Sequence, residues 1–416
     1  MTAQTDNTPS PHPGLGFRQF VALIALMMAI NALSIDIMLP ALPAIGDDLG
    51  VTNHNQRQWV ITAFLLGFGA AQLVYGTLAD RFGRKPVLLA GLGLYTAFTV
   101  LAAFAWDFES MVIARALQGV GAAATRVLAI SIVRDCYSGR RMARVMSLTF
   151  IVFLVAPVVA PSMGQLIVMV APWPWIFVVL AVMGGAILLW AALKLPETLR
   201  PEDRVPLSPR GVLGAFRVAL TARVAVGYML ASTAIVGCLF AFLASAQQIF
   251  ADALGAPELL APLFAVVACA MGAASFLNAR IVERVGSRRV SHAALLGFIA
   301  FALIHAAVAY AGHETVLAFV ILQSAMMFCF GLVGSNFNAM AMEPLGHIAG
   351  TASSVQGFVT TIGAALLGAF IGQQFDGTVI PLTLGFAGCG ALALLIVLWT
   401  EKGRLFRPVQ PAPPPS

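Results

Sequence analysis

The chain has 416 residues, of which 60% are hydrophobic and only 10% are charged. A soluble domain carries about 25% charged residues, so this composition excludes a soluble protein and makes lipid the solvent for much of the chain. The charges behind the formal net charge of +6 lie in short gaps between apolar runs, which indicates membrane topology and not nucleic-acid binding.

Apolar segments recur along the chain, each near the roughly 20 residues that a helix needs to cross a bilayer. In chain order, the twelve predicted spans are 18–43, 57–79, 86–106, 109–133, 145–169, 173–195, 223–250, 258–281, 289–311, 315–341, 346–374 and 379–400. The proline-rich polar gap at 196–222 predicts a cytoplasmic linker between two six-helix halves, 18–195 and 223–400. Residues 1–17 and 401–416 are interpreted as disordered cytoplasmic tails. The sequence therefore predicts an all-α polytopic membrane protein.

The distribution of positive charge predicts the orientation, because loops rich in Lys and Arg stay in the cytoplasm. With the N-terminus inside, all 24 Lys and Arg residues except Arg57, Arg115 and Arg126 fall in segments on the cytoplasmic side. The opposite loops carry mainly acidic residues. This asymmetry predicts a multi-pass protein of the bacterial inner membrane with both termini in the cytoplasm.

One loop is repeated in the two halves. Residues 76–86, after the second span, align without a gap with residues 279–289, after the eighth span, at an offset of 203 residues. Parallel halves with a substrate site between them near the membrane midplane are one transporter architecture. We expect the acid of the loop to pair with an arginine, or to face a helix N-terminus, in one conformation only and so to latch a cytoplasmic gate. The alternative is a simple topology anchor. The predicted gate residues are Gly76, Asp80, Arg81, Gly83, Arg84, Glu283 and Arg284.

Four motifs resemble those of a known transporter family. Residues 76–85 resemble the loop signature of the major facilitator superfamily, and residues 115–123 resemble the fourth-helix motif of its drug:proton antiporters. Residues 156–164 resemble the fifth-helix antiporter motif, although Ala160 and Pro161 replace its usual Gly-Pro pair. Residues 36–43 resemble the first-helix signature of the Bcr/CflA multidrug-resistance subfamily. The resemblance implies two six-helix halves, drug export coupled to protons, and a role for the arginine of the fourth-helix motif in that coupling.

Few ionisable residues lie within the predicted spans, and these are functional candidates because a charge in the bilayer costs several kcal/mol. Asp36 is the only acid well inside a span, and Arg115 lies at a similar depth, about 10 Å below the outer surface at roughly 1.5 Å per residue. Burial favours the protonated form of an aspartate, whereas a nearby arginine favours the ionised form. We predict that Asp36 carries the coupling proton and that Arg115 assists it. The alternative for Asp36 is a structural polar contact near the outer mouth.

Two further titratable groups leave their roles open. Arg126 lies 11 residues after Arg115 and therefore on nearly the same helix face. It would neutralise an acidic partner, orient substrate or form a structural ion pair. His305, in the ninth span, is interpreted as a helix-contact residue or as a proton relay.

The cavity wall is predicted from polar residues in otherwise apolar spans. These candidates are Asn31, Arg126, Gln118, Gln247, Asn336, Asn338 and Gln356. The 16 Met and 28 Phe residues suit varied apolar ligands, because such surfaces repack. In the fifth span Pro157 and Pro161 bend the helix, and small residues ending at Gly164 form a smooth face for close packing or sliding.

Together these features predict a proton-coupled efflux antiporter that exports small, largely apolar drug-like compounds by alternating access. The main alternative is a proton-coupled uptake symporter or facilitator for a small metabolite on the same fold. The sequence contains no motif for nucleotide binding, zinc hydrolysis or a nucleophilic serine, so an enzyme is not expected. A receptor or scaffold would not need charges inside the bilayer. We expect a monomer in the lipid bilayer, with no cofactor, metal or nucleic acid and with protons as the coupling ion.

Overall fold

The structure is a computed structural model, and it describes residues 15–204, 214, 217–218 and 220–406. The side chains of residues 153–154 and 346–349 lie outside this description. The predicted tails before residue 15 and after residue 406, and the central part of the predicted linker, also lie outside the described residues.

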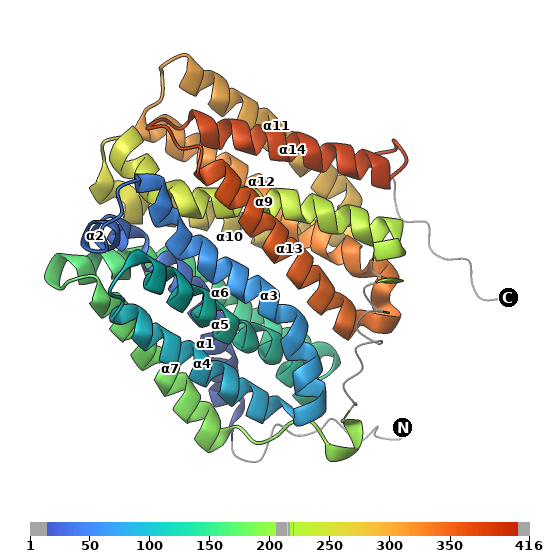
Figure 1. Ribbon diagram of the computed structural model, residues 1–416. Coiled ribbons are helices and arrows are strands. Elements are labelled where there is room, and N and C mark those ends of the chain that lie inside the picture. Colours follow the sequence, from blue (N-terminus) through green and yellow to red (C-terminus); the bar gives the residue numbers. More distant parts are fainter. Residues whose placement is uncertain (1–14, 205–213, 215–216, 219, 407–416) are drawn as a thin grey trace. The chain divides into compact units, whose positions relative to one another are not determined.

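The chain divides into two compact units, Met1–Val212 and Leu213–Ser416, called unit 1 and unit 2. The long helices of unit 1 are α1 (Phe17–Asp36), α3 (Trp59–Phe82), α4 (Arg84–Ala103), α5 (Phe108–Cys136), α6 (Gly139–Val170) and α7 (Pro174–Lys194). Those of unit 2 are α9 (Arg223–Gln248), α10 (Leu260–Val285), α11 (Ser287–Tyr310), α12 (Val316–Met342), α13 (Ala349–Gly372) and α14 (Ile380–Thr400). Figure 1 shows unit 1 in blue to green and unit 2 in yellow to red.

Among the described residues, twelve helical segments are long and apolar enough to cross a membrane. The prediction of an all-α protein with twelve spans is therefore confirmed. The largest differences lie at two ends. The first span continues to Asp48 through the short helix α2 (Leu42–Asp48), and α6 begins at Gly139, six residues before the predicted start at 145. Residues 139–144, three of which are arginines, extend α6 beyond its apolar part, and a search for apolar runs does not detect such an extension.

In unit 1, α5 packs against both α3 and α4, and α1 packs against α6. Glycines allow the close approach of α3 and α5. A Cβ on Gly67 of α3 would overlap the backbone carbonyl of Ala116, and a Cβ on Gly119 of α5 would overlap that of Phe64. Small residues at such crossings bring helix backbones together. This contact places the start of α5 directly beside the start of α3.

In unit 2, α9 packs against α13 and α14, while α11 and α10 both pack against α12. Aromatic rings fill the space between α9, α10 and α12. The ring of Phe242 stacks on Phe264 at 5.5 Å between centroids, and Phe319 lies 6.4 Å from Phe242 and 5.5 Å from Phe250. These contacts fix the packing of unit 2 at the end where the α11–α12 loop lies.

Candidate functional site

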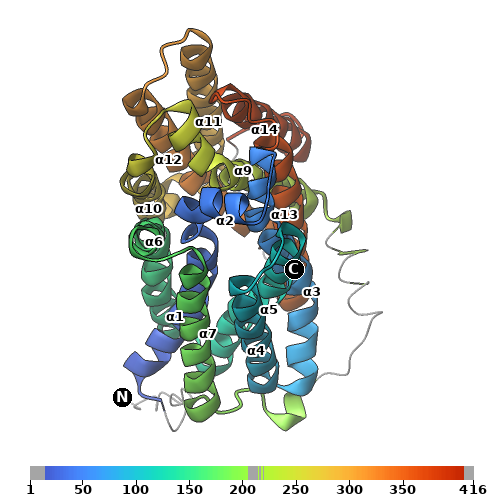
Figure 2. The same ribbon diagram turned by 60° about the vertical axis from the view of Figure 1, so that its left-hand side comes forward.

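The first membrane span is interrupted immediately after Asp36. Helix α1 ends at Asp36, the 3₁₀ turn η1 spans Leu39–Ala41, and α2 begins at Leu42 and runs in a different direction (Figure 2). Pro40 explains the break, because proline has no N–H for the carbonyl of the residue four positions earlier, here Asp36, and its ring clashes with that carbonyl. The sequence therefore places a carboxyl group at the carboxyl end of a broken transmembrane helix.

Asp36 is buried without a partner. The residue is 3% exposed, and among the described residues its side chain forms no hydrogen bond or ion pair. The carbonyl groups at the end of α1 carry partial negative charge, which disfavours a second negative charge there. An ionised carboxylate would thus have neither a cation nor a donor to replace the water that it loses.

Arg115 reaches the same turn of α1 without contacting the carboxylate. Its guanidinium donates from Nη2 to the carbonyl of Ser34 at 3.0 Å and from Nε to the carbonyl of Val60 at 2.8 Å. It also lies over the ring of Phe64, 4.5 Å from the centroid. The side chain is fully buried. Arg115 therefore joins α5 to α3 at Val60 and to α1 at Ser34, two residues before Asp36. No described carboxylate neutralises its charge.

Gln118 belongs to the same buried network. Its Oε1 accepts from Arg115 Nη1 at 2.5 Å, and its Nε2 donates to Thr99 Oγ1 at 2.7 Å. Tyr95 completes the network through a 2.7 Å hydrogen bond between its hydroxyl and Ser34 Oγ. Thr99 and Tyr95, both on α4, were not singled out by sequence, since a lone hydroxyl in an apolar run carries no distinctive signal. The network holds α1, α4 and α5 in fixed positions around the break.

Asn31 lies about one turn before Ser34 on α1, and Arg126 lies about three turns after Arg115 on α5. Asn31 donates to Thr125 Oγ1 at 3.0 Å, while its buried Oδ1 has no partner among the described residues. Arg126 is exposed, and its guanidinium lies 5.9 Å from the centroid of Phe68. Both arginines of α5 thus lie over rings of α3, as their helical spacing predicts. Only Arg126 remains accessible, and no described acid pairs with it.

The amides predicted for the cavity in unit 2 separate into three environments. Asn336 is 2% exposed and donates to Asn278 Oδ1 at 2.7 Å, which joins α12 to α10. Gln356 of α13 donates to the side chain of Asn338 at 2.5 Å. Gln247, near the end of α9, is 7% exposed and has no partner among the described residues. Asn336 therefore acts in helix packing, whereas Asn338 is exposed.

Helix α6 carries the predicted antiporter motif and packs against the broken span. Pro157 and Pro161 both lie inside this helix. Ala156 and Ala160 are buried, and a Cβ on Gly164 would overlap the carbonyl of Ile37, the residue that follows Asp36. The small-residue face is therefore in backbone contact with the break itself. Whether the two helices slide there stays a prediction.

The predicted gate loop of unit 1 is centred on Arg84. Arg84 is 4% exposed, and its guanidinium pairs with Asp80 at 2.5 Å and with Asp135 at 2.9 Å. Glu197, which follows α7, accepts from the backbone N–H of Arg84 at 2.8 Å and from that of Lys85 at 3.2 Å. A carboxylate at this place stabilises the positive N-terminus of α4. Asp80 therefore pairs with an arginine of its own loop, Arg84.

The other predicted gate residues make fewer contacts. Gly83 has a φ of +101°, and a Cβ there would overlap the Glu197 carboxylate, so glycine is needed for both reasons. Arg81 is exposed beside Phe82, Gly76 lies within α3, and Glu283 is exposed without a described partner. That the loop acid latches a cytoplasmic gate stays a prediction, because these contacts all lie within a single unit.

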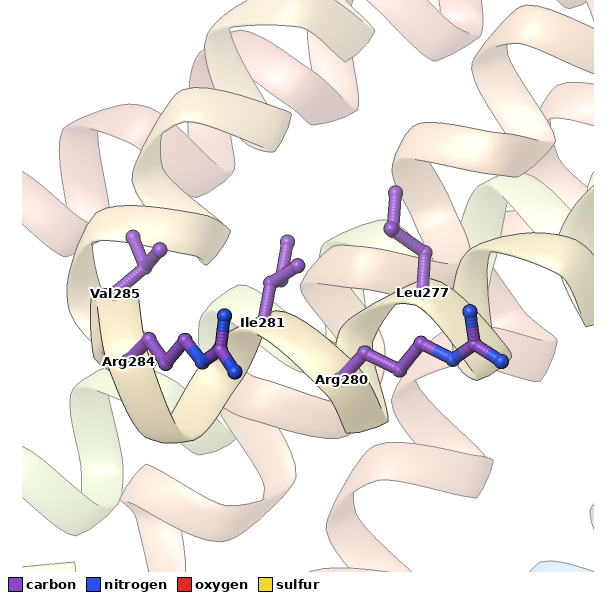
Figure 3. A pocket seen from close by; sticks show the side chains of 5 residues that line it. All are labelled: Leu277, Arg280, Ile281, Arg284 and Val285. Carbon is purple, nitrogen blue, oxygen red and sulfur yellow. The ribbon is translucent and has the colours of Figure 1, made fainter.

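A groove of about 490 Å³ follows one face of α10 near its end (Figure 3). It is lined by Leu277, Arg280, Ile281, Arg284 and Val285. The two guanidinium groups lie one helical turn apart on the same face, and neither pairs with a described acid. Arg284 therefore presents an open basic surface and not a closed ion pair.

Sequence reasoning missed the acids that complete the charged clusters. Asp135 lies among basic residues that indicate topology, so nothing singles it out. Glu197 and Glu401 are 204 residues apart, nearly the offset of 203 residues between the repeated loops. This spacing is the sequence signal that could have identified the two glutamates. Glu401 accepts from Arg288 Nε at 2.7 Å and from Tyr228 at 2.6 Å. Each unit therefore has a glutamate after its last long helix that joins the charged loop.

Comparison with known proteins adds family information to this geometry. Residues 24–369 match the description of the Major Facilitator Superfamily. The bicyclomycin resistance protein homolog of Haemophilus influenzae is 30% identical over 90% of this chain and 94% of its own length. The multidrug resistance protein MdtL of Escherichia fergusonii is 28% identical over 93% of this chain and 96% of its own length. The crystal structure of a D-xylose–proton symporter is similar, with a TM-score of 0.72 and 13% sequence identity. The match covers 93% of this chain and 98% of the symporter chain. The last likeness concerns the fold alone.

Proposed function

Because the chain belongs to the Major Facilitator Superfamily, we propose that it is a proton-coupled efflux antiporter that exports small, largely apolar drug-like compounds by alternating access. Family membership confirms the prediction from the motifs, including the Bcr/CflA resemblance, and makes the chain a membrane transporter and not an enzyme. The proposal concerns the direction of transport, the coupling ion and the class of substrate.

The observation that carries the proposal is the unpaired, buried carboxyl group of Asp36 at the break of the first span. Burying an ionised carboxylate without a partner costs several kcal/mol, and a carboxyl group avoids this cost by binding a proton. When the surroundings of Asp36 become wet, the proton is released. A change of access at Asp36 therefore loads and unloads one proton in each transport cycle.

Arg115 assists by position. Its bonds to the carbonyls of Ser34 and Val60 hold the last turn of α1 in place. The guanidinium forms no ion pair with Asp36, so the carboxyl group remains free to exchange its proton with water. A direct ion pair would instead hold Asp36 ionised through the cycle.

The substrate class is supported by the relatives and by composition. The two curated relatives carry names that refer to bicyclomycin resistance and multidrug resistance. Membrane-embedded charges in the described chain are few, whereas Met and Phe number 16 and 28. Surfaces of this composition accept varied apolar ligands. We propose that Arg126, Gln247 and Asn338 offer polar contacts to such ligands.

The proposal includes the setting of the transporter. We place it in the bacterial inner membrane with both termini in the cytoplasm, because Lys and Arg gather in the segments assigned to that side. It works as a monomer, uses protons as the coupling ion, and needs no cofactor, metal or nucleic acid. Asp80 and Arg84 belong to the cytoplasmic gate.

The experiment compares ethidium accumulation in cells that express the wild type, Asp36→Asn or Asp252→Asn. Asp252 is an exposed acid at the end of α9 and serves as the matched control. We expect the wild type and Asp252→Asn to lower accumulation and Asp36→Asn to leave it as in cells without the transporter, with equal amounts of protein in the membrane. Raised accumulation with the wild type would instead identify an uptake carrier.

A further inference from the structure

His305 and Glu314 form a buried pair in unit 2. His305 lies on α11, five residues before its end, and is fully buried. Glu314 lies in the α11–α12 loop and has a side chain that is 13% exposed. The imidazole Nε2 and the carboxylate Oε1 are 3.0 Å apart. An imidazole and a carboxylate in contact away from bulk water can share and bind protons. The proposed coupling at Asp36 and Arg115 makes no use of this pair.

The contact fixes which imidazole nitrogen is able to take a proton. A carboxylate only accepts hydrogen bonds, so the Nε2 that faces it carries the hydrogen of the neutral ring. The other nitrogen, Nδ1, then bears a lone pair. It is buried and has no partner among the described residues, and the same is true of Glu314 Oε2. The pair therefore keeps one vacant acceptor on each side chain.

Further unpartnered polar atoms lie on α12, the helix that packs against α11. Eleven buried side-chain nitrogen and oxygen atoms lack a partner in the described part of the chain, and five of them belong to His305, Glu314, Gln323 and Ser324. Gln323 lies one helical turn beyond Phe319 on α12, and the ring of Phe319 contacts the imidazole at 5.4 Å between centroids. Buried polar groups of this kind are normally satisfied by water.

The remaining charged groups near α11 are distant or exposed. Helix α12 contributes no charged side chain, and Tyr310, the last residue of α11, and His313 in the adjoining loop are exposed. On the other elements at this end, Asp252 follows α9, Glu258 precedes α10 and Asp376 precedes α14, and all three are exposed. Within α10, Glu283, Arg280 and Arg284 lie at the opposite end of the helix, and α14 contributes only Cys389. Glu314 is therefore the charge in contact with His305.

We infer that His305 and Glu314 form a proton-binding site at the outer end of unit 2, in which Nδ1 takes the proton and Glu314 balances its charge. The step forms one N–H bond at Nδ1 with a proton taken from a hydronium ion, which becomes water, while the hydrogen bond from Nε2 to Glu314 is kept. Glu314 lies directly before Thr315, the N-cap of α12, where the positive helix end stabilises the carboxylate. The product is an imidazolium–carboxylate pair.

The inference deepens the proposed function, on which it rests for the orientation of the chain and for the use of protons. In that orientation the α11–α12 loop faces the outside solution, which supplies the driving protons. The site therefore makes transport respond to the outside pH through a group in unit 2, separate from Asp36 in unit 1.

The test is a pH titration of histidine side chains by nitrogen NMR on the full chain in lipid nanodiscs. Among the signals of the six histidines, we expect that of His305 to show protonation at Nδ1 as the pH is lowered. His305→Gln, which still donates to Glu314, removes this signal. Glu314→Gln, which still accepts from Nε2, moves the titration to lower pH because the balancing charge is gone. The control His313→Gln, on the exposed neighbouring loop residue, leaves the titration in place.

A signal of His305 that stays in one neutral form throughout, or a titration that Glu314→Gln does not move, would overturn the inference. Should His305→Gln fail to fold, the shift in Glu314→Gln identifies the signal by itself. Asp36→Asn separates the two proposals, because it is expected to abolish driven export and leave the His305 titration unchanged. In proteoliposomes at a fixed pH difference, His305→Gln is expected to flatten the dependence of export on outside pH relative to His313→Gln. Identical profiles would contradict a role in transport.

Discussion

The two repeated loops, 76–86 in unit 1 and 279–289 in unit 2, share a backbone but differ in their ion pairs. Gly83 has φ and ψ of 101° and 157°, and Gly286 has 91° and 143°. Each glycine N–H donates to the carbonyl four residues earlier, at 3.2 Å in unit 1 and 2.8 Å in unit 2. Each loop therefore ends one long helix and begins the next in the same way.

The arginine that anchors the loop has moved by one position. In unit 1 it is Arg84, the first residue of α4, which pairs with Asp80 and Asp135. In unit 2 the matching position holds Ser287, and Arg288, the second residue of α11, pairs with Glu401 and Glu343. Glu283, the equivalent of Asp80, is consequently left exposed.

Comparison of the two loops shows which residues fix the backbone turn and which fix the ion pairs. The glycine fixes the turn, because its backbone conformation is accessible mainly to glycine. The acid and the arginine fix which segments are held together, and one shifted residue is enough to change them. In unit 1 the arginine pairs with the loop acid and with Asp135, whereas in unit 2 it pairs with Glu343 and with the glutamate after the last helix. The following substitutions test this contrast.

The largest effect is expected for Arg84→Met. Removing a buried arginine leaves Asp80 and Asp135 without their cation, which should lower the free energy of unfolding by about 3 kcal/mol. Thermal unfolding in detergent measures it. Arg81→Met, on an exposed neighbour, should stay within about 0.5 kcal/mol. Equal melting temperatures of the two variants would contradict the anchoring role of Arg84.

Arg288→Met should have a smaller effect, about 2 kcal/mol, because Tyr228 still donates to Glu401 when the arginine is gone. The same unfolding measurement applies, with Arg289→Met as the exposed control. A loss larger than that of Arg84→Met would reverse the order that we assign to the two loops.

The third prediction concerns pH. Burial acts against the charge of Glu401, but the hydrogen bonds from Tyr228 and Arg288 outweigh it and hold the pKa of this carboxyl below its usual range. A group with a lowered pKa in the folded state stabilises the protein above its unfolded pKa, near 4.3 for glutamate, and this contribution disappears as the pH falls through the folded value.

Glu401→Gln should therefore cost roughly 0.5–1 kcal/mol at pH 7, a figure reduced by solvent screening. The difference from the wild type should vanish as the pH falls through the lowered pKa of this carboxyl. Melting temperatures recorded from neutral to acidic pH measure it. A difference that is constant with pH would show that charge is not the reason for the effect.

The smallest effect is expected for Ser287→Arg, which gives Glu283 the arginine that Asp80 has. Because Glu283 is exposed, the new pair should add no more than about 0.5 kcal/mol. A double-mutant cycle with Glu283→Gln isolates the pair. A gain above 1 kcal/mol would mean that the environments of the two loops are more alike than their burial indicates.

Much of the architecture follows from the sequence. Apolar run length, polar gaps and the charge asymmetry predict the spans, since the bilayer allows few alternatives. The repeat of the loop predicts the shared turn at Gly83 and Gly286. The break after Asp36 was also predictable, because Pro40 cannot continue the helix, yet run length alone continued the predicted span without a break to residue 43.

The side-chain partners were less accessible from sequence. Equal depth suggested that Arg115 tunes Asp36, but depth says nothing about direction, and the guanidinium instead binds the carbonyls of Ser34 and Val60. Likewise, Gln118 was predicted to line the cavity, whereas in the structure its amide bonds to Arg115 and Thr99. Rotamers and helix rotation decide such contacts, and periodicity does not encode them.

The central claim is that Asp36 exchanges a proton for substrate, and transport into proteoliposomes measures this most directly. Purified wild type and Asp36→Asn are reconstituted, and substrate uptake is followed with and without an imposed pH difference. The account predicts that the wild type concentrates substrate when the pH difference is present. Asp36→Asn should retain exchange of substrate for substrate and lose concentration entirely. Concentration of substrate by Asp36→Asn under the pH difference would contradict the account.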